Sequence, residues 1–443
     1  MKFSKNLILR MLEGLREGSL ELVCPGETYN FGRPRRAASE PGATSCPGTA
    51  VISDSLRAVI AVHDERFFER ALFSGDIGLG ESYMQGEWSS PDLVTVIRLA
   101  IRNLNQLEHG NRLFSLLSRI ANSVQHRLRE NSITGSRKNI RHHYDLGNEF
   151  YKLFLDVSMA YSCAYFERED DTLAQAQIQK FDRICRKLRL SPGDHLLEIG
   201  TGWGGFSVHA ATRYGCRITT TTISREQHDY AAAWFSEMGL SSGSHPQVRL
   251  LFEDYRRLQG KHDKIVSIEM FEAVGLKQYD AYFGACDGLL EPHGTMLLQT
   301  INMNEHTFPD YIRGCDWIQK YIFPGAELAS LIEIQRSLTR CTSMSLYNAE
   351  NIGSHYAQTL KLWRASFLDR LSEVRAFGFD EVFIRMWDYY LAYCEGAFRE
   401  RHIGDFQLLL TKRLNAAPLV DEPRINEAAP GALARRIMNS DLR

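Results

Sequence analysis

One ten-residue stretch constrains the fold more than any other part of the chain. Residues 196–205 run from an apolar segment through Glu198 into closely spaced glycines. Gly200 and Gly202 can adopt backbone angles that other residues avoid, which lets the main chain approach a ligand. Residues 204–206 would then begin a helix whose free N–H groups face that ligand. The stretch predicts a strand, a ligand-binding loop and a helix, rather than an ordinary strand–turn–helix corner.

Length and charge narrow the class of protein. The chain has 443 residues, which is long for one hydrophobic core, so we expect two domains. A formal net charge of −2 gives no overall attraction to nucleic acid, and no nucleic-acid partner is predicted. Residues 1–22 lack a signal-peptide core, and no run approaches the length of a membrane span.

The cysteines indicate the redox compartment. All 9 are dispersed, with no CxxC pair and no Cys/His cluster at metal-ligand spacing. This pattern favours reduced thiols in a cytoplasm and predicts no metal site.

The N-terminal part of the chain predicts a small α+β domain over residues 1–105. Helical spacing covers 3–16, 66–75 and 91–104, β-branched residues favour strands within 50–61, and 25–49 and 80–88 are rich in loop and turn residues. Residues 106–139 form a basic linker. It is either solvated or in contact with anionic lipid headgroups, where each basic side chain contributes about 1 kcal/mol. Residues 416–443 are predicted to be a disordered tail.

Strands and helices alternate through the second domain, residues 140–415. After the strand that enters the glycine loop, we expect strands at 217–222, 248–252, 264–269, 295–301 and 406–410. Helices are expected at 172–188, 206–214, 225–238, 279–290, 326–338, 356–377 and 379–400. This order favours a mostly parallel sheet with helices on both faces.

The glycine loop is compatible with two cofactors. Residues 200–205 match Gly-x-Gly-x-x-Gly, so a nicotinamide enzyme is one interpretation. That pattern also requires an acid about 20 residues further on, where residues 219–222 are all threonine. Glu198 before the loop, and Asp254 where it could accept the adenine amino group, instead favour S-adenosylmethionine, a cationic sulfonium without a pyrophosphate.

The chain resembles the cyclopropane fatty acid synthase family of S-adenosylmethionine-dependent enzymes. The matching motifs are HYDLGNEFY (143–151), YSCAYF (161–166), LEIGTGWGG (197–205), TISREQ (222–227), MFEAVG (270–275), QKYIFPG (319–325), HYAQTL (355–360) and YCEGAF (393–398). GESYMQGEW (80–88) resembles the N-terminal domain of bacterial phospholipid-acting members. The resemblance implies an α/β fold: a doubly wound, mostly parallel seven-stranded class I methyltransferase sheet with helical insertions, plus the small N-terminal domain.

The resemblance also assigns site residues by motif. The residues implied to bind the cofactor are Tyr161, Ser162, Glu198, Gly200, Gly202, Thr222, Gln227 and Asp254. Those implied to serve catalysis are Glu272, Tyr356, Cys163, Gln299 and Cys394. In the family, bicarbonate held by such residues serves as the base.

The implied reaction adds a carbon from the sulfonium to the double bond of an unsaturated phospholipid acyl chain. Methylation leaves a carbocation, and closing a cyclopropane ring then requires loss of a proton from the transferred methyl group. Classical members carry a histidine where this chain has Gln299, whose amide hydrogen-bonds an anion but does not exchange a proton at neutral pH. A cyclopropane is the predicted product, and a methylene- or methyl-branched chain is the alternative.

The resemblance further implies a cytoplasmic protein, peripherally associated with the inner face of the membrane. Its partner would be the phospholipid bilayer surface, and a homodimer is suggested by the N-terminal domain. A non-catalytic lipid-binding protein with the same fold is the alternative from another functional class.

Overall fold

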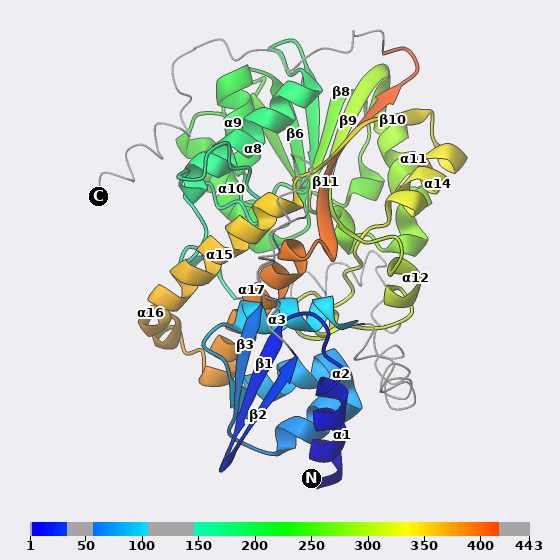
Figure 1. Cartoon of the computed structure of the whole chain (residues 1–443). Helices are drawn as coiled ribbons and strands as arrows, with labels where there is room; N and C mark the ends of the chain where they lie inside the picture. Colours follow the sequence, from blue (N-terminus) through cyan, green and yellow to red (C-terminus); the bar gives the residue numbers. More distant parts are fainter. Residues whose placement is uncertain (1, 33–55, 105–145, 416–443) are drawn as a thin grey trace, which may run out of the picture. The chain divides into compact units, whose positions relative to one another are not determined.

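The computed structural model describes residues 2–32, 56–104 and 146–415 (Figure 1). The chain divides into two compact units. The first comprises Met1–Val124, Gly314–Trp317 and Leu371–His402, and the second comprises Gln125–Arg313, Ile318–Arg370 and Ile403–Arg443. Residues 371–402, which we expected inside the second domain, therefore belong with the N-terminal residues. The predicted basic linker and C-terminal tail lie outside the described residues.

The first unit contains a four-stranded sheet in the order β2-β1-β3-β4. Strand β1 is antiparallel to β2 and parallel to β3, and β3 is antiparallel to β4. The strands are β1 (Ser19–Cys24), β2 (Glu27–Gly32), β3 (Arg57–Val62) and β4 (Trp88–Ser89). The helices are α1 (Lys2–Leu12), α2 (Arg66–Met84), α3 (Leu93–Arg102), α16 (Leu371–Ala376) and α17 (Glu381–Arg399).

Helix α2 differs from the sequence-based expectation. It was predicted to end at Gly75, but it only kinks there, at φ 55° and ψ −128°, and then continues to Met84. The predicted turn at 80–84 is therefore wrong. Gly80 lies so close to Trp317 that an added Cβ would be 2.4 Å from its indole ring. Packing against a residue far away in sequence thus favours helix at a glycine-rich segment.

The second unit is built on a seven-stranded sheet in the order β10-β11-β9-β8-β5-β6-β7. Strands β9, β8, β5, β6 and β7 are parallel, whereas β11 is antiparallel to β9 and to β10. The bounds are β5 (His195–Ile199), β6 (Arg217–Thr222), β7 (Val248–Phe252), β8 (His262–Ile268), β9 (Leu290–Met303), β10 (Met344–Asn351) and β11 (Ile403–Lys412). The predicted mostly parallel class I methyltransferase sheet is confirmed.

Helices cover both faces of this sheet (Figure 1). Neighbouring residues of β5 point to opposite faces: Leu196 joins a core with α8, α9 and α10, and Leu197 joins a core with α11 and α14. The helices are α7 (Asn148–Tyr151), α8 (Leu173–Leu188), α9 (Gly205–Tyr214), α10 (Arg225–Glu237), α11 (Tyr279–Leu289), α12 (Phe308–Tyr311), α13 (Trp317–Tyr321), α14 (Leu331–Cys341) and α15 (Gly353–Asp369). In the described ranges, no helix has both the length and the apolarity needed to cross a membrane.

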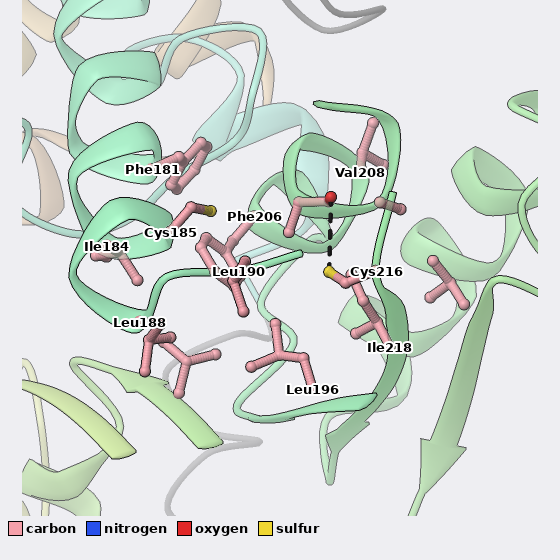
Figure 2. Close-up of a cluster of buried hydrophobic side chains, with 14 of the residues drawn as sticks. Phe181, Ile184, Cys185, Leu188, Leu190, Leu196, Phe206, Val208, Cys216 and Ile218 are labelled. Carbon is pink, nitrogen blue, oxygen red and sulfur yellow. Dashed lines mark hydrogen bonds between the residues drawn. The ribbon is translucent and has the colours of Figure 1, made fainter. Parts of the chain in front are cut away.

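Figure 2 shows the core that positions the glycine loop. Phe181 on α8 packs edge-on against Phe206 on α9, with ring centroids 5.7 Å apart. Cys216, which precedes β6, donates from its thiol to the carbonyl oxygen of Ala210 at 3.7 Å. The first contact packs the start of α9 against α8, and the second ties the body of α9 to the residue before β6, so the loop between β5 and α9 has a defined place.

The first residue of α9 provides a test of this packing. A Cβ at Gly205 would lie 2.4 Å from the carbonyl oxygen of Ser158, a backbone atom. We expect Gly205→Ala to lower the free energy of unfolding by about 1–3 kcal/mol, because the added methyl overpacks the site. The control is Gly284→Ala in α11, where a Cβ meets no atom within 4 Å and helix propensity favours alanine. Thermal or urea denaturation measures both, and equal stability of the two variants would contradict the expectation.

Candidate active site

The predicted site residues of the second unit gather at the carboxyl ends of its parallel strands. The glycine loop follows β5, and Glu269 and Glu272 follow β8, the strand paired with β5. Strand order reverses here, because β5 lies between β8 and β6. Ligands of open α/β sheets bind at such a switch point.

The glycine loop has the geometry expected of a backbone ligand site. Gly200, Gly202 and Gly204 have φ of 103°, 53° and 98°, which favour glycine. The N–H groups of Gly200 and Thr201 both donate to the carbonyl oxygen of Thr221 at 3.0 Å. A Cβ at Gly202 would meet no atom within 4 Å, so a ligand can approach the backbone there.

Glu198 lies beneath this loop. Its Oε2 accepts hydrogen bonds from Ser207 at 2.5 Å and Thr220 at 2.6 Å, and the residue is only 2% exposed. Burial raises the pKa of Glu198 to about 7. The carboxyl group thus ties α9 to β6, and its predicted contact with a cofactor stays a prediction.

Three further predicted cofactor residues follow the next two strands. The Thr222 hydroxyl donates to Gln227 Oε1 at 3.0 Å, at the end of β6. After β7, Asp254 accepts the backbone N–H of Arg256 at 3.0 Å and forms an ion pair with its guanidinium at 2.7 Å. These contacts orient the side chains along the same sheet edge as the glycine loop.

Glu269 accepts hydrogen bonds from three groups predicted to line the active site. Its Oε1 accepts the backbone N–H of Cys163 at 2.8 Å and the amide of Gln299 at 2.8 Å. Its Oε2 accepts the hydroxyl of Tyr356 at 2.7 Å. Glu269 has φ 48°, in the left-handed region that side chains rarely adopt. The structure therefore brings Cys163, Gln299 and Tyr356 together around a carboxylate that the sequence analysis did not select.

Sheet register explains why Gln299 lies there. On β9 it pairs with Ile268 of β8, which precedes Glu269, and with Gln407 of β11. Its Nε2 donates to Glu269 and, at 3.0 Å, to Asp405 Oδ2, while its Oε1 accepts from Gln407 at 3.1 Å. The Gln407 bond fixes the Gln299 amide so that its N–H groups face the two carboxyl groups.

Asp405 and Glu269 differ in how they can carry charge. Asp405 is fully buried, and burial, reinforced by the charge of Glu269, raises its pKa well above the usual range. Glu269 is half-buried and accepts three hydrogen bonds. A single negative charge shared by the pair is therefore best placed on Glu269, with the proton on Asp405.

Glu272, the predicted catalytic glutamate, lies in the turn after β8. Its Oε1 accepts the hydroxyl of Thr300 at 2.9 Å and the backbone N–H of Ile301 at 2.5 Å. Its Oε2 is buried without a hydrogen-bond partner among the described residues. Burial, with the charge of Glu269 second, raises the pKa of Glu272 to about 7.

Ser162 and Cys163 enter the site from the irregular segment before α8. Ser162 accepts a hydrogen bond from Lys180, whose ammonium is fully buried, at 2.6 Å. Burial lowers the pKa of Lys180, and the Glu269 carboxylate opposes that shift. Burial raises the pKa of the Cys163 thiol well above its usual range, and the backbone N–H of Cys163 donates to Glu269.

Tyr161 belongs to a continuous set of aromatic rings. Its centroid is 5.4 Å from that of Tyr151 and 5.3 Å from that of Trp363. Trp363 in turn contacts Tyr356, and Tyr151 contacts Trp203 of the glycine loop at 5.0 Å. Aromatic side chains thus connect the loop to the Glu269 carboxylate.

Cys394 lies elsewhere in the chain. It is on α17, in the first compact unit, where burial and then the charge of Asp316 raise the pKa of its thiol. Its predicted part in the active site stays a prediction.

Signals for two of the three missed residues, Glu269 and Lys180, were present in the sequence. Glu269 is an acid at the end of a predicted parallel strand, where ligand sites form. Lys180 lies on the buried face of α8, at helical spacing from Gln177 and Ile184. Asp405 carried no such signal, because its place depends on the antiparallel pairing of β11 with β9.

The sheet order, the glycine loop after β5 and the acids after β8 define a class I methyltransferase. Comparison with known proteins specifies the family. A sequence model described as mycolic acid cyclopropane synthetase matches residues 131–408. The chain is 38% identical over 348 residues to tuberculostearic acid methyltransferase UfaA1 of Mycobacterium tuberculosis, covering 76% of this chain and 79% of the relative.

A second relative and a solved structure indicate the same family. Cyclopropane-fatty-acyl-phospholipid synthase of Escherichia coli is 37% identical over 374 residues, covering 82% of this chain and 90% of the relative. The solved structure of the mycolic acid cyclopropane synthase CmaA1 with SAH and CTAB has a TM-score of 0.56 at 32% identity, covering 62% of this chain and 98% of that one. The chain belongs to the cyclopropane fatty acid synthase family of S-adenosylmethionine-dependent methyltransferases.

The raised pKa of Glu272 predicts a pH-dependent stability difference. Its pKa of about 7 in the folded protein exceeds the ordinary value of 4.5, so the folded state keeps its proton to a higher pH than the unfolded state does. The unfolding free energy of the wild type should therefore fall relative to Glu272→Gln between pH 4.5 and 7, by about 3 kcal/mol.

Urea denaturation across this pH range measures that difference. Glutamine keeps an oxygen for Thr300 and Ile301, so the variant removes mainly the ionisable group. Glu237→Gln, at the exposed end of α10, controls for loss of one negative charge. A wild-type to Glu272→Gln difference that is flat with pH would contradict the expectation.

Proposed function

We propose that this protein transfers a one-carbon unit from S-adenosylmethionine to the double bond of unsaturated acyl chains in membrane phospholipids. The predicted product is a cyclopropane fatty acid. The observation that carries the proposal is the buried carboxylate cluster beside the glycine loop, lined by aromatic rings. An acyl carbocation requires such a site, with a proton acceptor close by and few side-chain nucleophiles.

The residues of the glycine loop and of the sheet edge beside it suit S-adenosylmethionine. The open backbone at Gly202, the side chains of Thr222, Gln227 and Asp254, and the Tyr161–Ser162 segment would hold it. When bound, S-adenosylmethionine supplies an electrophilic methyl group, which a weakly nucleophilic alkene needs. A nicotinamide cofactor is disfavoured because 219–222 hold threonines in place of a ribose-binding acid.

The aromatic rings stabilise the acyl carbocation that forms after methyl transfer. Each ring face stabilises a nearby cation by about 0.5–2 kcal/mol without forming a bond to it. Trp363 contacts both Tyr356 and Tyr161, so the three rings can share this role. They also exclude water, which would hydrate the cation.

A branched product is the second candidate, and Gln299 favours it. Where classical members have histidine, Gln299 orients a carboxylate but does not carry a proton. One relative is named a tuberculostearic acid methyltransferase. The cation here could lose a neighbouring proton after a hydride shift, giving a methylene- or methyl-branched chain.

Incubation with labelled S-adenosylmethionine and vesicles of unsaturated phospholipid tests the proposal. We expect label in the extracted fatty acids, and none with vesicles of fully saturated phospholipid, because the reaction needs a double bond. Mass spectrometry then separates ring from branch. Absence of label from unsaturated lipid would refute the proposed activity, and label in saturated chains would refute the substrate.

We further propose that the protein acts in the cytoplasm at the inner membrane face. The basic residues of 106–139 would meet anionic headgroups, and Phe3 on α1 is 67% exposed in the first unit. The substrate also requires contact with a membrane surface, because its double bond lies within a bilayer. A homodimer is proposed as well, and sedimentation at the mass of one chain would refute it.

Vesicle binding tests the basic segment. We expect replacement of Arg127, Arg129 and Lys138 by glutamine to weaken binding to anionic vesicles by about 3 kcal/mol, about a hundredfold. High salt should remove the difference. A control replaces three exposed arginines of the described second unit by glutamine: Arg225, Arg313 and Arg336. Equal weakening by both triple variants would indicate a general charge effect and contradict a localised contact.

A further inference from the structure

The resemblance implies a bicarbonate base, and the structure allows its fit to be tested. The groups expected to hold that anion include Cys163, Gln299 and Tyr356. In this protein the Cys163 N–H, the Gln299 amide and the Tyr356 hydroxyl all donate to the carboxylate of Glu269, at 2.7–2.8 Å. A bicarbonate would compete for these donors beside an existing negative charge, so it does not fit.

We propose that Glu269 is itself the base, and that the enzyme works without bicarbonate. This inference rests on the proposed function and adds the identity of the proton acceptor. The Glu269 carboxylate spreads one negative charge over two oxygens, as the CO₂⁻ portion of bicarbonate does. It is carried by the chain, at the end of β8, instead of being bound from solution.

Glu269 is the accessible member of the carboxyl pair. Its two oxygens accept hydrogen bonds from the three donors, and Asp405 hydrogen-bonds to it as well. Glu269 is half-buried, whereas the neighbouring Asp405 and Gln299 are both 0% exposed. Among these three side chains, Glu269 is therefore the one that a substrate can reach.

The surrounding residues favour the charged form of Glu269 and hold it in place. Burial raises the pKa of Glu269, and the hydrogen bonds from Tyr356 and the Cys163 N–H, followed by the charge of Lys180, oppose that rise. The Gln299 amide is fixed by Gln407, and Tyr356 holds the second oxygen. These contacts orient the carboxylate before any substrate binds, which lowers the reorganisation needed in the transition state.

The proposed step balances as follows. After methyl transfer, the acyl chain bears a carbocation next to the new methyl group. A C–H bond of that methyl group breaks, and its electron pair forms the third carbon–carbon bond of the ring. The proton forms an O–H bond with Glu269, which becomes neutral, and the positive charge of the chain is cancelled.

The experiment uses the full-length protein, labelled S-adenosylmethionine and unsaturated phospholipid vesicles, in buffer freed of carbon dioxide. We expect the wild type to turn over at the same rate with or without added bicarbonate. Glu269→Gly suits the left-handed φ of 48° and opens the carboxylate position. Its rate should fall about 10²–10⁴-fold and recover partly on addition of bicarbonate, acetate or formate.

Two variants serve as matched controls. Glu269→Gln should lose a similar factor but show no rescue, because its amide fills the space that an added anion would need. Arg189→Gly removes a side chain at a similar left-handed φ of 55°, at the end of α8, and should keep a bicarbonate-independent wild-type rate. Circular dichroism confirms that each variant is folded.

The outcomes separate the two proposals. A wild type that methylates lipid only with added bicarbonate overturns the role of Glu269 and leaves the proposed function standing. This result needs no variant, so misfolding of a variant does not obscure it. A folded Glu269→Gly that keeps the wild-type rate, or that loses it without rescue, also overturns the role. A wild type that labels no lipid with or without bicarbonate refutes the proposed function, and the inference falls with it.

Discussion

The pairing of β8, β9 and β11 is the constraint on which the site depends. It sets Gln299 opposite Ile268 on one side and opposite Gln407 on the other. Because alternate residues of a strand face opposite sides, a shift by one residue would turn Gln299 away from Glu269. The hydrogen bonds to Glu269, Asp405 and Gln407 are therefore consequences of register, and they in turn exclude other registers.

Burying several carboxyl groups together is unfavourable unless each is neutralised or hydrogen-bonded. The structure uses both means. Glu269 accepts three hydrogen bonds, whereas burial raises the pKa of Asp405 so that it keeps its proton. Low polarity strengthens each remaining interaction, so the same burial that raises these pKa values also strengthens the hydrogen bonds that hold Glu269.

Much of the fold could be predicted because its signals are local. Strong apolar periodicity predicted the parallel strands and α8 to α11. Two missed strands lacked that signal, because β10 is largely exposed and polar and β2 is mostly exposed. Strand β1 does alternate buried positions with less buried ones, so its signal was present and was missed. Glu272, Tyr356, Cys163 and Gln299 could be selected from the sequence because they stand in recognisable motifs, whereas Asp405 and Lys180 stand in none.

The sequence by itself determined the glycine loop, the alternation of strands and helices, and the order of motifs that identifies the family. These properties follow from backbone freedom and side-chain periodicity, which act over a few residues. Only the tertiary structure decided that Glu269 takes the donors of Cys163, Gln299 and Tyr356, and that Leu371–His402 joins the N-terminal unit. Both depend on contacts between residues 30 to 305 positions apart, where register and burial decide which groups meet.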